Sequence, residues 1–242
     1  DAAALSDAPA DARLSVSLAP DAHKFGGAAL SDAAGFRRAA ALLKAGAPRP
    51  QLAVVSATFG TTDRLVAALA SAKAGRDHAD LPFLLASHRA LIAPLGLASD
   101  LLDGDIAQLD ADLAHLRSGK KDSGQAARIS GAGEVWSSRI LAALLGSDWA
   151  WLDAREVLVV THGELGARLD DAATREALAA WRRTHPQPNL IVTGFLARLD
   201  DGTTTTLGRN GSDYSAALFA ALFSARELTI WKEVDGLMSA DP

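Results

Sequence analysis

Residues 190–224, LIVTGFLARLDDGTTTTLGRNGSDYSAALFAALFS, decide the fold class. The apolar, β-branched run at 190–193 is typical of a buried strand. Short segments on either side of Asp200-Asp201-Gly202 predict a β-hairpin, because this tripeptide forms tight turns. A glycine-rich loop then opens an alanine-rich helix over 211–224. A strand, a hairpin and a loop ending at a helix N-terminus together indicate an α/β protein.

The rest of the chain alternates strands and helices in the same way. This alternation predicts a mostly parallel sheet with helices on both faces. An exposed loop is expected at 118–125, and Gly96 and Gly104 are expected to break the helical region that follows Pro82. The other expected strands are one ending at Lys24 and those at 52–55, 149–152, 157–160, 195–199, 203–207 and 228–231. The other expected helices run from Ser31 or Asp32 to Lys44, from Thr61 or Thr62 through Leu69, from Gly133 to Leu145, and from Asp170 or Asp171 to a point before Pro186.

The composition excludes several classes of function. The 242 residues carry a net charge of -5, whereas a nonspecific nucleic-acid partner requires a basic surface. The chain has no cysteine, which excludes disulfide frameworks, thiolate metal sites and a cysteine nucleophile and suits a cytoplasmic protein. No apolar run is long enough to span a membrane. Residues 1–20 mix Ala, Asp, Ser and Pro without periodicity and are expected to form a flexible tail.

Lys24-Phe25-Gly26-Gly27 stands at the end of an expected strand. Two glycines there can bring backbone N–H groups and one ammonium group close to a phosphate. The pattern is not a Walker loop, and the alternative is an ordinary turn with a solvated lysine.

Two further segments place polar groups at helix N-termini. Ser56 to Thr62 directly follows a core strand, where ligands of α/β proteins bind; the alternative is that Thr61 or Thr62 only caps the next helix. Glu134 opens another helix after Gly133 and either binds an ammonium group or only complements the helix dipole.

The loop Leu207 to Ser215 is the most specific segment. Arg209 offers a planar fork for a carboxylate or phosphate, and Ser212 and Asp213 stand where helix amides are unpaired. Asp213 either caps this helix, or aligns Lys24 and organises a metal–nucleotide complex. The last segment, Trp231 to Pro242, either flanks a nucleotide or is a solvated turn.

These five segments, in this order, resemble the aspartate kinases, and most of all the kinase domain of bifunctional aspartokinase–homoserine dehydrogenases. The resemblance covers about residues 22–242. It implies the amino-acid-kinase fold, a three-layer αβα sandwich around a mostly parallel sheet. It also implies transfer of the γ-phosphoryl group of ATP, bound with Mg²⁺, to the side-chain carboxylate of L-aspartate. This reaction opens the pathway to lysine, threonine and methionine.

The resemblance also implies roles for single residues. Lys24 and Asp213 are the expected catalytic residues. The expected aspartate-binding residues are Ser56, Thr62, Glu134, Arg209 and Ser212. The expected nucleotide-binding residues are Lys24, Gly26, Gly27, Lys232, Glu233, Asp235, Met238 and Asp241. No protein group is expected to bind Mg²⁺ directly, and the full-length protein is expected to be a homo-oligomer without a nucleic-acid or membrane partner.

Some positions depart from the family pattern. Ala28-Ala29 replaces a common Thr-Ser, Ala132 replaces Arg or His, and Lys232-Glu233 replaces Thr-Asp. Met238 stands where Tyr often packs on the nucleotide. The family's kinase domain also continues past Pro242, so residues 21–242 are expected to be a truncated catalytic domain. Another amino-acid kinase, or a noncatalytic binding module, remains an alternative.

Overall fold

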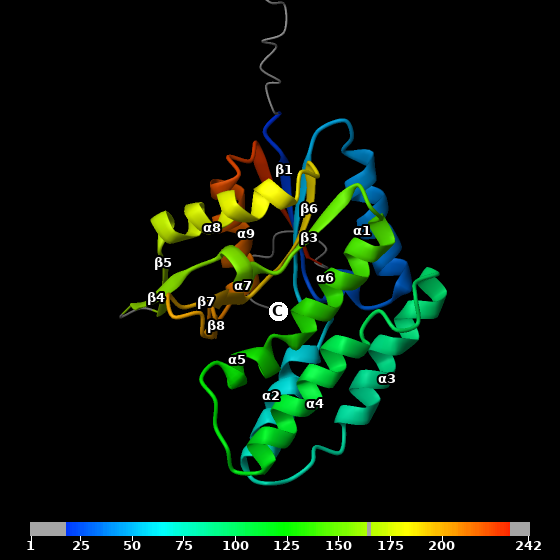
Figure 1. Ribbon diagram of the computed structural model, residues 1–242. Helices are drawn as coiled ribbons and strands as arrows, with labels where there is room; N and C mark the ends of the chain where they lie inside the picture. The colour runs from blue at the N-terminus through cyan, green and yellow to red at the C-terminus, as the bar shows by residue number, and fades with distance from the viewer. Residues whose placement is uncertain (1–17, 164–165, 233–242) are drawn as a thin grey trace, which may run out of the picture.

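The computed structural model describes residues 18–163 and 166–232, and five parallel strands form its central sheet (Figure 1). Their order is β3-β6-β2-β1-β9. The expectation of an α/β protein with a mostly parallel sheet is confirmed. The strands are β1 (Asp21–Phe25), β2 (Gln51–Val55), β3 (Trp149–Leu152), β6 (Asn189–Thr193) and β9 (Glu227–Trp231).

Helices cover both faces of this sheet. In β2, Ala53 and Val55 point into one apolar cluster, while Leu52 and Val54 point into a second cluster on the opposite face. A strand buried on both sides reads as a continuous apolar run, as β2 does. The result is the expected αβα sandwich. The first face is covered by α1 (Ala33–Ala45) and α6 (Ala132–Leu145), the second by α8 (Asp171–Thr184) and α9 (Gly211–Leu222).

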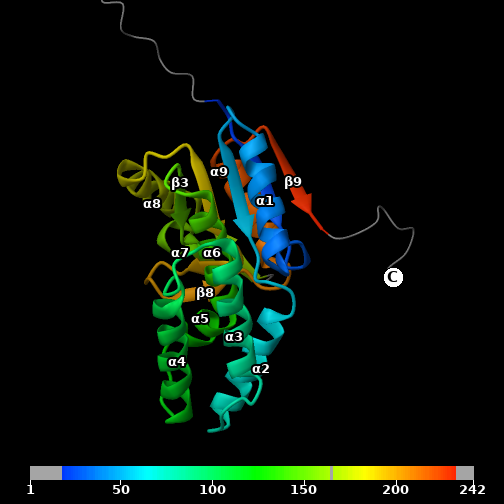
Figure 2. The same cartoon turned by 90° about the vertical axis from the view of Figure 1, so that its right-hand side faces the viewer.

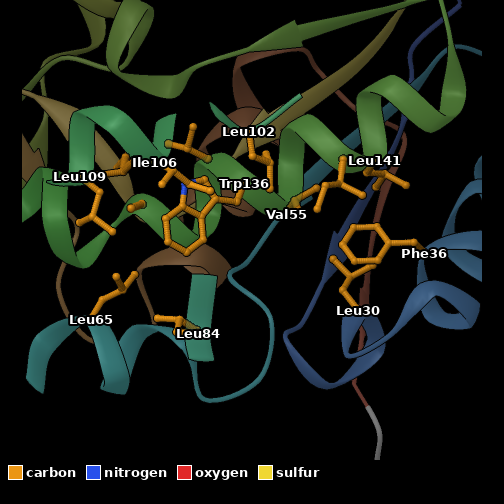
Figure 3. Packing of buried hydrophobic residues seen from close by; sticks show 14 of the residues in the cluster. Leu30, Phe36, Val55, Leu65, Leu84, Leu102, Ile106, Leu109, Trp136 and Leu141 are labelled. Carbon is orange, nitrogen blue, oxygen red and sulfur yellow. The ribbon is translucent and has the colours of Figure 1, made fainter. Parts of the chain in front are cut away.

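Four more helices gather beyond the carboxyl ends of the strands (Figure 2). The first apolar cluster continues into them, so they share the core of one sheet face. Trp136 of α6 is fully buried at this junction, and Figure 3 shows its indole among Leu65, Leu84 and Ile106. The four helices are α2 (Thr61–Lys73), α3 (Leu81–Ile92), α4 (Asp103–Arg117) and α5 (Gln125–Ser130).

The remaining elements are short. The predicted hairpin is present but shorter than expected, because Phe195 has a positive φ of 64° and stands before the first strand. A second antiparallel pair was not predicted. The short elements are the 3-10 turns η1 (Ala28–Leu30) and η2 (Ala93–Leu95), helix α7 (Ala154–Val157), the pair β4 (Val160–Gly163) and β5 (Gly166–Leu169), and the hairpin β7 (Leu196–Arg198) and β8 (Thr204–Thr206).

Two expectations in the middle of the chain were wrong. The apolar run 157–160 is not a strand: Val157 ends α7, and only Val160 begins β4. All four side chains are buried, three of them in the second cluster, and outside β4 the run makes only an isolated bridge from Val159 to Arg198, so its apolar pattern reflects burial and not a strand of the central sheet. Gly96 follows η2 as a break, but Gly104 lies inside the first turn of α4 and does not interrupt it.

Other boundaries also shifted. Gln125 is buried and begins α5, whereas the sequence predicted an exposed loop up to this residue. The N-cap of α2 is Gly60, so neither Thr61 nor Thr62 caps that helix. The helix that begins at Gly211 ends at Leu222. Of the expected N-terminal tail, residues 1–17 lie outside the described residues.

Helix α1 distinguishes the two candidate caps at its N-terminus. Asp32 is the N-cap, and its Oδ1 accepts a hydrogen bond from the Gly35 N–H at 2.7 Å. Replacing Asp32 with Ala removes this bond and is expected to lower the free energy of unfolding by about 1 kcal/mol. Urea denaturation followed by circular dichroism measures the change. Ser31→Ala is the matched control and should stay within about 0.5 kcal/mol of the parent; equal losses at both positions would contradict the assignment.

Candidate active site

The carboxyl ends of the central strands open onto one pocket of about 530 Å³. Because the strands are parallel, the residues that follow them lie at the same edge of the sheet. Of the residues expected to act on a ligand, this pocket brings together Lys24, Ser56, Thr62, Glu134, Arg209, Ser212, Asp213 and Lys232. Glu233, Asp235, Met238 and Asp241 lie outside the described residues.

A carboxylate shared by two ammonium groups lies in this pocket. Lys24 Nζ is 2.9 Å from Asp213 Oδ1, and Lys232 Nζ is 3.3 Å from Asp213 Oδ2. Desolvation alone would raise the pKa of Asp213, but the two lysines outweigh it and lower the pKa below its ordinary value. Lys24 is only 7% exposed, and Asp213 supplies the counter-charge that a nearly buried ammonium group requires. Asp213 is therefore ionised at neutral pH and holds two cations beside the pocket.

The loop before α9 carries Asp213 to Lys24. Asn210 is the N-cap of α9 and adopts the left-handed conformation, with a φ of 57°. Asp213 lies in the first turn of the helix, where its carboxylate contacts the lysines. The alternative in which Asp213 serves as the N-cap is excluded. Arg209, on the same loop, is exposed and lines the pocket, so its planar set of donors can reach an anion there.

Glu134 reaches the pocket from the opposite layer. It stands in the first turn of α6 and is only 4% exposed. Among the described residues its Oε2 atom has no hydrogen-bond partner. Burial raises the pKa of Glu134 to about 8, although the amides of Ala57 and Glu134 and the charge of Lys24 oppose this rise. With the pocket empty, Glu134 is thus mostly protonated at neutral pH.

A close contact between helix and loop makes this placement possible. A Cβ atom at Gly133 would lie 2.6 Å from Thr61 Cγ2 and 2.8 Å from Ala57 Cβ. Only glycine lets the start of α6 approach the β2–α2 loop at this distance. The two segments that the sequence singled out separately, 56–62 and 133–134, are therefore in direct contact.

The two glycines after Lys24 have a different place from the one expected. Neither lines the pocket. The Gly26 N–H donates to the Trp231 carbonyl at 3.2 Å, so it extends the pairing of β1 with β9. A Cβ at Gly27 would lie 2.6 Å from the Ala57 carbonyl oxygen, which explains why this position requires glycine.

Some residues near the pocket were not anticipated from the sequence. Asp63 and Phe195 line it, and Phe195 is held in its positive-φ conformation by a bond from its N–H to Ser215 Oγ at 2.9 Å. The Gly-Phe pair before the hairpin was a possible signal for this turn. His88 contacts the β2–α2 loop from the side of α3. In the sequence it stands within a helical segment, and no motif singles it out.

The sequence of this chain is similar to those of a known protein family. Residues 22–242 match the sequence profile of the Amino acid kinase family. The chain belongs to this family.

Several relatives of this amino acid kinase have names that state an activity. It is 37% identical over 230 residues to bifunctional aspartokinase/homoserine dehydrogenase 2 of Escherichia coli (strain K12), a match that covers 91% of this chain and 28% of the relative. It is 32% identical to the aspartokinase of Chlamydia trachomatis, covering 93% of this chain and 51% of the relative.

A solved structure gives a similar result. E. coli aspartokinase III in complex with aspartate and ADP superposes with a TM-score of 0.74 at 26% identity, covering 90% of this chain and 50% of that one. This amino acid kinase therefore spans about half, or less, of the length of these three proteins. None of the helices in the described part of the chain is long and apolar enough to cross a membrane.

The raised pKa of Glu134 gives the ligand-free protein a specific pH dependence. Its carboxyl group keeps a proton up to about pH 8 when folded, but loses it near 4.5 when unfolded. Between these values unfolding releases a proton, so this group lowers stability as the pH rises, by at most about 1.4 kcal/mol per pH unit. Urea denaturation at pH 5, 6, 7 and 8 measures the slope.

Glu134→Gln is the matched variant, because its amide cannot ionise. The stability of this variant relative to the parent should increase steadily from pH 5 to pH 8. Parallel pH profiles for the two proteins would show that Glu134 is ionised in the ligand-free pocket.

Proposed function

We propose that the chain is part of an aspartate kinase, which transfers the γ-phosphoryl group of MgATP to the side-chain carboxylate of L-aspartate and forms 4-phospho-L-aspartate and ADP. The observation that carries this proposal is the combination in one pocket of a lysine-bound carboxylate, an exposed arginine and a buried glutamic acid whose Oε2 atom has no hydrogen-bond partner among the described residues. The names of the aspartokinase relatives support the same activity.

The cationic part of the pocket suits the phosphoryl group. The bond between the γ-phosphorus and the bridging oxygen of ADP breaks, while a bond forms between that phosphorus and a carboxylate oxygen of aspartate. This carboxylate is already ionised at pH 7, so no general base is needed. Catalysis then depends on alignment and on neutralising charge on the phosphoryl oxygens. Lys24 provides that charge, and Asp213 keeps its ammonium group aimed at the pocket.

The other part of the pocket suits an α-amino acid. Arg209 can form two parallel hydrogen bonds to the α-carboxylate, and Glu134 can pair with the ammonium group. A cationic partner lowers the pKa of a buried carboxyl group, so Glu134 ionises as the amino acid binds. Ser56, Thr62 and Ser212 line the same pocket, and their hydroxyl groups are proposed to donate to the substrate's carboxylates.

The proposed nucleotide-binding part of the site extends past the end of the central sheet. Lys232 lines the pocket at the end of β9, and the residues after it are proposed to continue along the nucleotide: Glu233, Asp235, Met238 and Asp241. Gly26 and Gly27 support this side by shaping the chain after β1. Mg²⁺ is proposed to enter as part of MgATP, held chiefly by phosphate oxygens.

The wider role follows from the reaction. Phosphorylation of aspartate opens the synthesis of aspartate-derived amino acids, lysine, threonine and methionine among them. We therefore propose a cytoplasmic biosynthetic enzyme whose small-molecule partners are L-aspartate and ATP. Residues 21–242 are proposed to form part of its catalytic domain, and the full-length protein is proposed to be a homo-oligomer.

An acyl-phosphate assay tests the proposed reaction. The protein is incubated with MgATP, hydroxylamine and either L-aspartate or L-glutamate, and the hydroxamate that forms is measured. Aspartyl hydroxamate is expected only with both ATP and aspartate present. Product with glutamate but not with aspartate would assign the chain to another amino-acid substrate, and no product from the full-length protein with either would overturn the kinase proposal.

Two variants separate the phosphoryl side from the amino-acid side. Lys24→Met removes the charge but keeps most of the side chain, so turnover should fall by at least about 100-fold while aspartate affinity changes little. Arg209→Ala removes the carboxylate fork, so aspartate affinity should fall about tenfold or more. Isothermal calorimetry and steady-state kinetics measure the two effects. Equal losses of affinity and turnover in both variants would contradict the division of roles.

A further inference from the structure

His88 forms a polar contact that the proposed chemistry does not use. It is a buried residue of α3, only 2% exposed, and it does not line the pocket. Its neighbours are Thr58 and Thr61 on the β2–α2 loop and at the start of α2. That loop also carries Ser56 and leads into Thr62, which both line the pocket.

The hydrogen bonds define which ring nitrogen of His88 carries the proton. Nδ1 lies 2.9 Å from the carbonyl oxygen of Leu84, which can only accept, so Nδ1 is the donor. Burial lowers the pKa of His88, and the charge of Arg64 adds to this, although the Leu84 carbonyl opposes it. The ring is therefore neutral at pH 7, and Nε2 is an acceptor.

This acceptor orders the two threonine hydroxyl groups. Thr58 Oγ1 lies 3.1 Å from Nε2 and donates to it. Thr61 Oγ1 lies 2.6 Å from Thr58 Oγ1 and donates in turn. The result is one directional chain of hydrogen bonds from Thr61 through Thr58 and His88 to the carbonyl of Leu84. An apolar residue at position 88 would leave these buried hydroxyls without their acceptor.

The same loop is held from its other side by β1. The Phe59 N–H donates to the Gly27 carbonyl at 3.1 Å, and the Ser56 N–H donates to the Phe25 carbonyl at 3.1 Å. Directly after Phe59 the chain turns into α2 through Gly60, with a φ of 72°. The loop is thus anchored to the sheet at Ser56 and Phe59, and to α3 at Thr58.

His88 also contacts the helix that carries Glu134. Its ring meets the indole of Trp136 edge-on, with centroids 4.8 Å apart and an interplanar angle of 67°. Trp136 is the residue labelled at the centre of the packing in Figure 3, two positions after Glu134 in α6. His88 therefore contacts two of the segments that present the amino-acid side of the pocket, the β2–α2 loop and α6.

We propose that His88 is a positioning residue for the acceptor amino acid: by accepting the Thr58 hydroxyl it fixes the loop 56–62, and with it the hydroxyl groups of Ser56 and Thr62. This inference rests on the proposed aspartate kinase activity for its substrate. Under this proposal, a residue of α3, which lies outside the pocket, affects the affinity for aspartate but not the affinity for the nucleotide.

Two polar substitutions test this role with little change in size. In His88→Gln the amide can reach the place of Nε2 and face Thr58, whereas in His88→Asn the shorter side chain reaches only the place of Nδ1, facing Leu84. His88→Asn and His88→Leu should raise the KM for aspartate about tenfold, as expected for one lost hydrogen bond of a buried group, with the KM for ATP unchanged within about twofold. His88→Gln should restore aspartate KM to within about threefold of the parent.

Ile92→Val is the matched control, because Ile92 lies one turn later on the buried face of α3 and makes no polar contact. It should lower stability without changing either KM. The proposal would be overturned if the KM for aspartate rose in proportion to the loss of thermal stability across all variants. It would also be overturned if the KM for aspartate were unchanged in His88→Asn. Should His88→Leu fail to fold, Thr58→Val removes the same bond from the loop side and must raise the KM for aspartate alike.

Hydrogen exchange separates this inference from the proposed function. Amides of residues 56–60 should exchange faster in His88→Asn than in Ile92→Val, whatever the protein phosphorylates. If the parent protein forms no aspartyl hydroxamate but the exchange difference is present, the kinase proposal fails and the positioning role of His88 stands. If exchange in the two variants is equal, the positioning role fails whatever the activity.

Discussion

The ion pair between Lys24 and Asp213 is the contact on which the pocket depends. It joins the end of the central strand β1 to the first turn of α9, and Lys232 extends it to the end of β9. A nearly buried ammonium group is costly without a counter-charge, and a buried carboxylate is costly without a cation. Each group therefore stabilises the other at the edge of the pocket, where the lysine can contact an anionic ligand.

The two helical layers around the sheet contribute different residues to the pocket. The layer of α9 supplies Asp213, Ser212 and Arg209, and the layer of α6 supplies Glu134. Lys24 and Lys232 at the ends of β1 and β9 make the side near α9 cationic, while the layer of α6 presents a protonated carboxyl group when no ligand is bound. The continuous core around Trp136 links this second layer to α2 and α3, so packing far from the pocket acts on its acidic side.

Much of the fold was predictable, because β2 and β6 are short apolar runs that contain β-branched residues, a pattern typical of strands buried on both faces. The run 157–160 shows the limit: it is equally apolar and buried, but it spans the end of α7 and the start of β4, and a one-dimensional pattern does not distinguish this burial from a strand of the central sheet. At the site, Lys24, Glu134, Arg209 and Asp213 were found through their short motifs. His88 was not, since its partners lie about 30 residues away in the chain.

The protonated state of Glu134 has a consequence for ligand choice. As a neutral acid it can donate a hydrogen bond and does not repel an anion, so below its pKa Glu134 gives no electrostatic preference for an amino acid over a plain diacid. Above its pKa the same residue becomes a buried anion that tolerates only ligands bringing their own positive charge. Discrimination between amino acids and plain diacids therefore sharpens as the medium becomes alkaline.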